Sequence, residues 1–216
     1  MLEMNASPRL RRVKHGYTAG ARSLASRSVT RLARAGVSPN VLTATGVSLC
    51  LAAAILVPFE DRTSKLLVYW LAAGIFVVGS LLDILDGALA RIGGKSTPFG
   101  AFIDSTTDRV GEGAMLAAIA FVFARDGKDW AVVLAVAAVV GSFLVSYTRA
   151  RAEALGLRGD VGIGSRAERV VVITVGLVLA PWGALIWAIG FLTATAWFTV
   201  GQRVWSVRTQ LRRSRP

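Results

Sequence analysis

The sequence has 216 residues, 54% of them hydrophobic, and its mean hydropathy is +0.55. These values exclude an ordinary soluble domain and leave room for several membrane-spanning helices. The formal net charge is +12, and in so apolar a chain this excess indicates cytoplasmic loops and contact with a lipid bilayer, not nucleic acid. The single cysteine and single histidine exclude an intrachain disulfide and argue against a His/Cys metal site, so any metal must be held by oxygen ligands.

The first predicted element is an amphipathic helix over residues 19–36. Arg27, Arg31 and Arg34 share one helical face, and apolar side chains occupy the other. This spacing is typical of a helix that lies in the headgroup region of a membrane; a solvated basic arm is the alternative. The turn residues Ser38-Pro39-Asn40 then break the pattern before the first apolar segment.

Six apolar segments follow that are candidates to cross a hydrocarbon core of about 30 Å. They are Val41–Phe59, Ser64–Leu85, Gly100–Ala124, Trp130–Arg149, Arg169–Ala180 and Trp182–Val204. The last two are separated only by the residues around Pro181, so one long kinked segment, and hence five spans, is the alternative. The expected fold class is an all-α integral membrane protein with six transmembrane helices preceded by the interfacial helix. It forms one domain over residues 1–216, with the helix bundle over residues 41–206.

The basic residues test this layout, because cytoplasmic loops are rich in Lys and Arg. All but four of the 25 lie on one side of a six-helix arrangement; the exceptions are Arg62, Lys65, Arg125 and Lys128. An odd number of spans would put the two basic tails on opposite sides, so six spans are favoured over five. The chain is therefore expected to be a multi-pass protein of the cell (cytoplasmic) membrane, with both termini on the cytoplasmic side.

Four aspartates lie around the turn between the second and third segments. Asp83 and Asp86 are three residues apart, Asp104 and Asp108 are four apart, and each pair shares a helical face. The segment 93–98 is rich in glycine and ends in proline, which predicts a tight turn and antiparallel neighbouring helices. The four carboxylates are therefore expected to converge on one point near the cytoplasmic surface.

Convergent carboxylates repel one another in a low dielectric unless cations compensate their charge. With oxygen ligands only, Mg²⁺ or Mn²⁺ is the natural occupant, and four acids can hold two ions about 3.5–4 Å apart, as in two-metal phosphoryl-transfer sites. Gly87 and Gly100 lie on the same helical faces and permit close approach. Two alternatives are simple ion pairing with Arg91, Lys95 and Arg109, and an ion or proton pathway through a transporter.

Eight positions of this region resemble the signature of the CDP-alcohol phosphotransferases, in the order Asp83-x2-Asp86-Gly87-x2-Ala90-Arg91-x8-Gly100-x3-Asp104-x3-Asp108. The resemblance implies a membrane enzyme of phospholipid biosynthesis that transfers a phosphatidyl group from CDP-diacylglycerol, or a related CDP-alcohol, to an acceptor hydroxyl and releases CMP. It also implies a homodimer.

The resemblance further implies roles for individual residues. Asp83, Asp86 and Asp104 would bind metal, and Asp108 would act as the general base while also touching a metal. The residues implied on the CDP-diacylglycerol side are Asn40, Gly87, Ala90, Arg91 and Gly100.

Residues 146–169 carry the signal for the acceptor. Arg166 and Arg169 share a helical face, and arginine binds phosphate with a planar fork, so an acceptor with its own phosphate is indicated; the positive-inside rule is the alternative explanation. The pattern around Ser146-Tyr147-x-Arg149 and Arg166-x-Glu168-Arg169 resembles the phosphatidylinositol phosphate synthases of actinobacteria and archaea. That resemblance implies inositol 1-phosphate as acceptor, with phosphatidylglycerophosphate synthesis from glycerol 3-phosphate as the alternative. The implied acceptor-binding residues are Ser146, Arg149, Arg166, Arg169 and Arg203.

Overall fold

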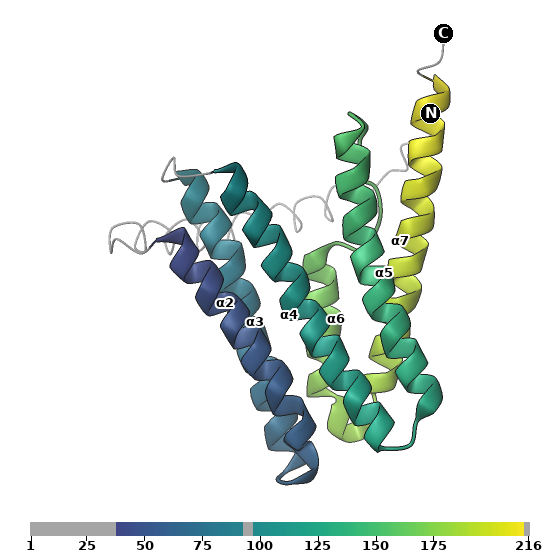
Figure 1. The fold of residues 1–216 in the computed structure, drawn as a ribbon. Coiled ribbons are helices and arrows are strands. Elements are labelled where there is room, and N and C mark those ends of the chain that lie inside the picture. The colour runs from purple at the N-terminus through teal and green to yellow at the C-terminus, as the bar shows by residue number, and fades with distance from the viewer. Residues whose placement is uncertain (1–37, 93–96, 214–216) are drawn as a thin grey trace, which may run out of the picture.

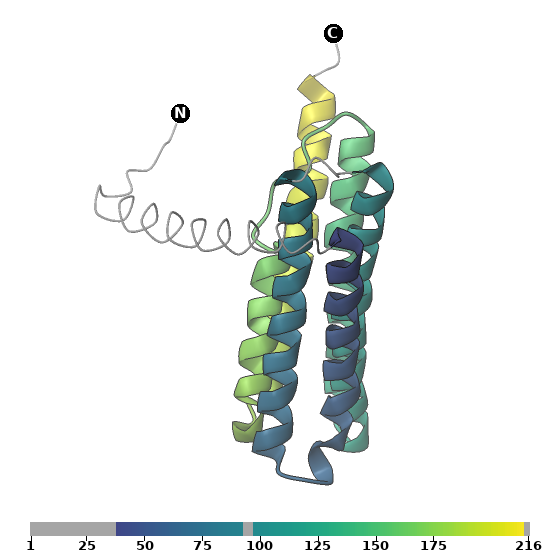
Figure 2. The ribbon, with the colours of Figure 1, turned by 90° about the vertical axis from the view of Figure 1, so that its left-hand side faces the viewer.

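A computed structural model describes residues 38–92 and 97–213, and over these residues the chain forms helices and turns without a β-strand. The predicted interfacial helix over residues 19–36 lies outside the described part of the chain. The described residues form six α-helices that run side by side and alternate in direction (Figures 1 and 2). They are α2 (Pro39–Leu56), α3 (Lys65–Ile92), α4 (Pro98–Arg125), α5 (Asp129–Ala154), α6 (Arg166–Val178) and α7 (Leu185–Arg213).

Each predicted apolar segment corresponds to one of these helices, but several helices continue beyond the apolar run. The helix α3 continues to Ile92 and α5 to Ala154, because these extensions are rich in Ala, Leu, Arg and Glu, which are good helix formers whether or not the segment is apolar. By length and composition, four helical segments of the described chain suit a membrane span: Pro39–Asp61, Lys65–Ala90, Asp129–Ala154 and Leu185–Arg213. The chain is therefore an all-helical protein with several helices suited to a bilayer.

The turn between the last two helices settles whether they form a hairpin or one kinked segment. The helix α6 ends at Val178, and the short 3-10 helix η2 (Ala180–Trp182) follows it. Gly183 then adopts a φ of 80°, in the left-handed region that favours glycine. The chain reverses there, so the kinked-segment alternative is wrong and α6 and α7 are separate antiparallel helices (Figure 1).

Three helices begin toward the same end of the bundle, and each is capped by a hydroxyl side chain. Ser38 accepts a hydrogen bond from the Val41 amide at the start of α2, and Thr97 accepts one from the Gly100 amide at the start of α4. Ser165 starts α6 within a complete capping box that it forms with Glu168. The caps satisfy free backbone amides and define where each helix begins, at the end of the bundle that carries the aspartates.

The opposite end of the bundle carries a buried ion pair. Glu60, in the 3-10 helix η1 (Val57–Asp61), is 1% exposed and pairs with Arg125 at the end of α4 and with Lys65 at the start of α3. Between the two ends, the apolar core is formed by side chains of all six helices. Large apolar side chains also cover outer faces of the bundle, for example Trp187 at 78% exposure, as expected for a protein surrounded by lipid.

The helices α2 and α3 approach closely at two glycines. A Cβ atom on Gly79 would lie 2.7 Å from the backbone oxygen of Gly46 and 2.9 Å from Cys50 Sγ. Neither helix backbone can yield without separating the pair. Since Gly79 lies one helical turn before Asp83, this contact also sets the distance from α2 to the aspartates.

We expect Gly79→Ala to destabilise the bundle by about 1–3 kcal/mol, the usual range for overpacking. The matched control is Gly74→Ala on the same helix, where a Cβ atom would meet nothing within 4 Å. Thermal unfolding of detergent-purified protein measures both, and equal melting temperatures for the two variants would contradict the prediction.

Candidate active site

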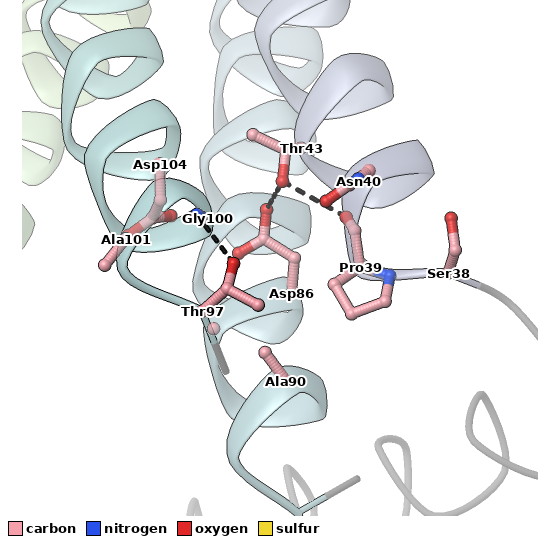
Figure 3. Close-up of a pocket in the computed structure, with 11 residues that line it drawn as sticks. Ser38, Pro39, Asn40, Thr43, Asp86, Ala90, Thr97, Gly100, Ala101 and Asp104 are labelled. Carbon is pink, nitrogen blue, oxygen red and sulfur yellow. Dashed lines mark hydrogen bonds between the residues drawn. The ribbon is translucent and has the colours of Figure 1, made fainter. Parts of the chain in front are cut away.

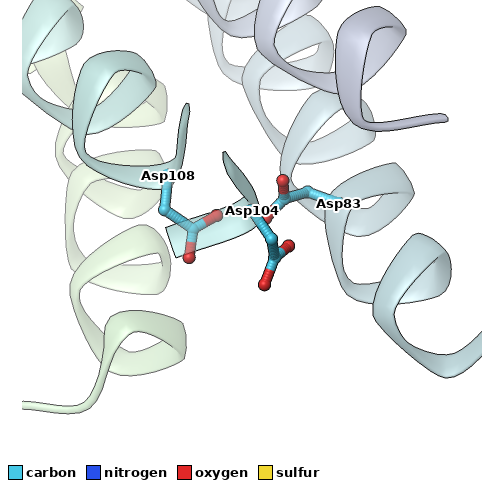
Figure 4. A group of neighbouring side chains, drawn as sticks. All are labelled: Asp83, Asp104 and Asp108. Carbon is cyan, nitrogen blue, oxygen red and sulfur yellow. The ribbon is translucent and has the colours of Figure 1, made fainter. Parts of the chain in front are cut away.

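Three of the four predicted aspartates converge at one end of the bundle. Asp83 on α3 and Asp104 and Asp108 on α4 each offer a carboxylate oxygen, and these oxygens lie within 4.8 Å of one another. Figure 4 shows the three carboxylates turned toward a common region between the two helices. Asp86 is not part of this group and lies one turn further along α3. The predicted convergence is therefore found for three aspartates, with the fourth beside them.

Asp86 faces the start of α2 instead. It is 2% exposed, and the Thr43 hydroxyl donates a hydrogen bond to its Oδ2 atom (Figure 3). Its Oδ1 atom is buried and has no hydrogen-bond partner among the described residues. A buried carboxylate oxygen without a donor is costly unless a cation binds it. Thr43 was missed by sequence reasoning, although its position one turn after Asn40 offered a weak signal.

A first cavity of about 340 Å³ opens between the starts of α2 and α4 and the end of α3 (Figure 3). Four of the five residues expected on the CDP-diacylglycerol side line it: Asn40, Gly87, Ala90 and Gly100. The side chain of the fifth, Arg91, lies outside the described part of the structure. Asp86 and Asp104 form the wall of the cavity toward the aspartate group.

A second cavity, of about 540 Å³, lies among α4, α5, α6, α7 and the connection between α5 and α6. All five residues expected to bind the acceptor line it: Ser146, Arg149, Arg166, Arg169 and Arg203. Asp104 lines this cavity as well as the first one. The two cavities therefore meet at the aspartates, one rich in small residues and the other in arginines.

Arg166 stands where the arginine-lined cavity reaches the aspartates. Its guanidinium pairs with Asp83 and lies 2.7 Å from Asp108 Oδ1. Arg149, on α5, is exposed and pairs with Glu153 one turn away, at 2.9 Å. Both arginines remain accessible enough to exchange these partners for a ligand.

Two further arginines that line this cavity, Arg169 and Arg203, are buried and bonded to the protein. Arg169 binds Glu112 on α4 through two hydrogen bonds, of 2.7 and 2.9 Å. Arg203 on α7 donates to the carbonyl oxygens of Val161, at 2.8 Å, and Val145. The partners of these two arginines were not predicted from the sequence. The position of Glu112, one turn beyond Asp108, was a signal for the partner of Arg169. Sequence patterns give no such signal for the backbone carbonyl partners of Arg203.

Side chains of α7 hold the connection between α5 and α6 in place. Gln210 accepts from the Arg158 amide and donates to the Arg158 carbonyl oxygen, at 2.9 and 3.0 Å. Thr199 accepts from the Gly164 amide at 3.1 Å. Gly162, with a φ of 124°, packs so closely on Thr199 that a Cβ atom would lie 2.4 Å from its Cγ2 atom. These contacts with α7 hold the connection that forms part of the wall of the second cavity. They were not predicted from the sequence.

Comparisons with known proteins agree with this geometry. The family model of CDP-alcohol phosphatidyltransferases matches residues 36–208. A phosphatidylinositol phosphate synthase of Mycolicibacterium smegmatis is 38% identical over 194 residues, which is 85% of this chain and 84% of that protein. These matches support the transferase interpretation of the aspartates over the transporter alternative.

Two solved structures of the phosphatidylinositol phosphate synthase (PgsA1) of Mycobacterium tuberculosis have the same fold. One has CDP-DAG bound, with a TM-score of 0.75 and 30% identity, over 86% of this chain and 94% of that one. The other is a complex with manganese and citrate, with a TM-score of 0.74 and 32% identity, over 86% and 89%. Sequence, fold and the two cavities lead to the same assignment: the chain belongs to the CDP-alcohol phosphatidyltransferase family.

Proposed function

We propose that the chain is a membrane-embedded phosphatidylinositol phosphate synthase. It transfers the phosphatidyl group of CDP-diacylglycerol to inositol 1-phosphate and yields phosphatidylinositol phosphate and CMP. The observation that carries this proposal is the meeting of two cavities at Asp104, one lined by small residues and the other by arginines. A donor and a phosphorylated acceptor can then reach the same carboxylates from opposite sides.

The donor side is the cavity that Asn40, Gly87, Ala90 and Gly100 line. The small side chains on α3 and α4 leave room for the nucleotide. Arg91, four residues after Gly87 in the sequence, binds a phosphate oxygen of the donor. The crystal structure of the mycobacterial relative with CDP-DAG supports the same class of donor.

The aspartates fit divalent cations, because one oxygen from each of three carboxylates lies within 4.8 Å of the others, and the fourth has a buried oxygen to which no described residue donates. We assign Asp83, Asp86, Asp104 and Asp108 as ligands of two Mg²⁺ or Mn²⁺ ions. When bound, such ions neutralise charge on the transferred phosphoryl group and on the leaving CMP. The manganese complex of the mycobacterial relative supports this class of metal.

On the acceptor side, the exposed Arg149 and the partly exposed Arg166 bind the acceptor phosphate with their guanidinium groups, together with the Ser146 hydroxyl. Arg169 and Arg203 add positive charge to the same cavity from its wall.

Asp108 lies at the boundary between the acceptor cavity and the other aspartates, and acts as the general base. The acceptor oxygen bonds to the phosphatidyl phosphorus as its proton passes to Asp108. The bond from that phosphorus to the bridging pyrophosphate oxygen breaks, and CMP leaves.

The membrane arrangement belongs to the same proposal. The six helices cross the bilayer within one domain over residues 1–216, and the active site and both termini face the cytoplasm. The distribution of basic residues in the sequence supports this orientation. Two chains associate as a homodimer, and the many small residues of the helices permit the close packing that this requires.

The test is CMP release by the purified protein in vesicles with CDP-diacylglycerol and Mg²⁺. We expect release with inositol 1-phosphate, little with free inositol or serine, and none after chelation of the metal by EDTA. CMP release with glycerol 3-phosphate but not with inositol 1-phosphate would show that the acceptor is glycerol 3-phosphate, and the proposed role of the arginines in binding its phosphate would stand. Release only with an unphosphorylated acceptor would contradict the phosphate-binding cavity, and no release with any of the four would contradict the transferase function.

A further inference from the structure

Glu112 and Arg169 form a buried ion pair between α4 and α6, and the proposed chemistry gives Glu112 no role. Their side chains are 3% and 5% exposed, and the guanidinium binds the carboxylate through Nε and Nη2. A third donor, Nη1, binds the Gly164 carbonyl oxygen at 2.8 Å. Three of the five N–H donors of Arg169 are thus held by the protein, which leaves two for a ligand.

This pair is the inner of two contacts between the same two helices. Asp108 and Glu112 are four residues apart on α4, and Arg166 and Arg169 are three apart on α6, so each pair shares a helical face. The outer contact, between Asp108 and Arg166, is 19% and 26% exposed. Removing either partner of the inner contact would leave a buried charge without compensation, whereas the outer contact can exchange its partners with ligands.

The third bond of Arg169 reaches the residue that precedes α6. Gly164 is held from two sides, because its carbonyl oxygen binds Arg169 and its amide donates to Thr199 on α7. The capping residue Ser165 follows, and Arg166 is the first residue of the helix. The direction in which Arg166 leaves the backbone therefore depends on where Arg169 holds the start of α6.

We propose that Glu112 is a positioning residue for the acceptor step. Through Arg169 it fixes the start of α6 and thereby holds the Arg166 guanidinium at the edge between the aspartates and the acceptor cavity. Glu112 itself touches neither substrate. This role rests on the proposed function, since it requires that Arg166 binds the acceptor phosphate.

The experiment must separate positioning from stability. In Glu112→Gln the Arg169 charge loses its partner, so we expect a lower melting temperature as well as weaker acceptor binding. The double variant Glu112→Leu/Arg169→Met removes both charges together and keeps the volume roughly constant, which preserves stability far better than breaking the pair. We expect this variant to remain folded, with a KM for inositol 1-phosphate raised about tenfold and a nearly unchanged KM for CDP-diacylglycerol.

The matched control is Glu60→Gln, which breaks the pair between a buried carboxylate and Arg125 at the far end of the bundle. It should lower the melting temperature as Glu112→Gln does and leave both KM values unchanged. An unchanged acceptor KM in the folded double variant would overturn the proposal and leave the pair a purely structural contact. A parallel rise of both KM values would also overturn it. Failure of the parent protein to turn over a phosphorylated acceptor would instead contradict the proposed function. The proposed function is therefore tested on the parent protein, and the role of Glu112 is tested on the variants.

Discussion

Asp108→Asn should lower the rate of CMP release by about 10³-fold or more, the loss expected when a general base is removed. The asparagine side chain has the same shape as aspartate and cannot accept the acceptor proton. Asp108 lines the acceptor cavity and not the cavity assigned to CDP-diacylglycerol, so binding of the donor should remain measurable. Turnover and CDP-diacylglycerol binding are therefore measured on the same preparation.

A suitable control is Asp126→Asn, which changes an aspartate at the opposite end of α4 that pairs only with Lys128 among the described ion pairs. Its turnover should equal that of the parent protein. If Asp108→Asn retains turnover, Asp108 is not the base. If Asp108→Asn loses CDP-diacylglycerol binding together with turnover, Asp108 acts mainly in binding the metal and the donor.

Arg166→Gln should have opposite effects on the acceptor and on the metal. Loss of two charge-assisted hydrogen bonds to the acceptor phosphate should raise the acceptor KM about 100-fold. The same guanidinium pairs with Asp83 and Asp108, and therefore competes with a divalent cation for their oxygens. Its removal should make Mn²⁺ bind more tightly, because a positive charge next to the ligands is lost. Steady-state kinetics and a Mn²⁺ titration followed by electron paramagnetic resonance measure the two effects separately.

Arg158→Gln is the matched control, since Arg158 lies on the connection before α6 with its side chain 83% exposed. Both the acceptor KM and the Mn²⁺ affinity should stay at the parent values in this variant. Weaker Mn²⁺ binding by Arg166→Gln would contradict the competition between the guanidinium and the metal. An unchanged acceptor KM would remove Arg166 from the phosphate site.

The helices and the position of the aspartates could be predicted because both depend on local periodicity. Apolar runs of sufficient length predict helices in a lipid environment, where every backbone group must be paired within the segment. Spacings of three and four residues then determine which aspartates share a helical face, whatever the rest of the fold does. The second and fourth predicted segments ended earlier than their helices, which continue to Ile92 and Ala154, because hydropathy reports the apolar part of a helix and not its hydrogen bonding.

The partners of the charged side chains could not be predicted in the same way. Arg166 and Arg169 are equivalent by sequence pattern, yet one reaches the exposed edge of the aspartates and the other is buried against Glu112. Arg203 binds two backbone carbonyls, and the Thr43 hydroxyl donates a hydrogen bond to Asp86 from α2.

The sequence alone determined the class of protein, its helices, and the chemistry that four aspartates and a group of arginines can perform. Only the tertiary structure decided which arginines stay available to a ligand and which cavity each residue lines. The physical reason is that composition and helical periodicity are properties of contiguous residues. Burial and ion pairing instead depend on how helices distant in the sequence pack together.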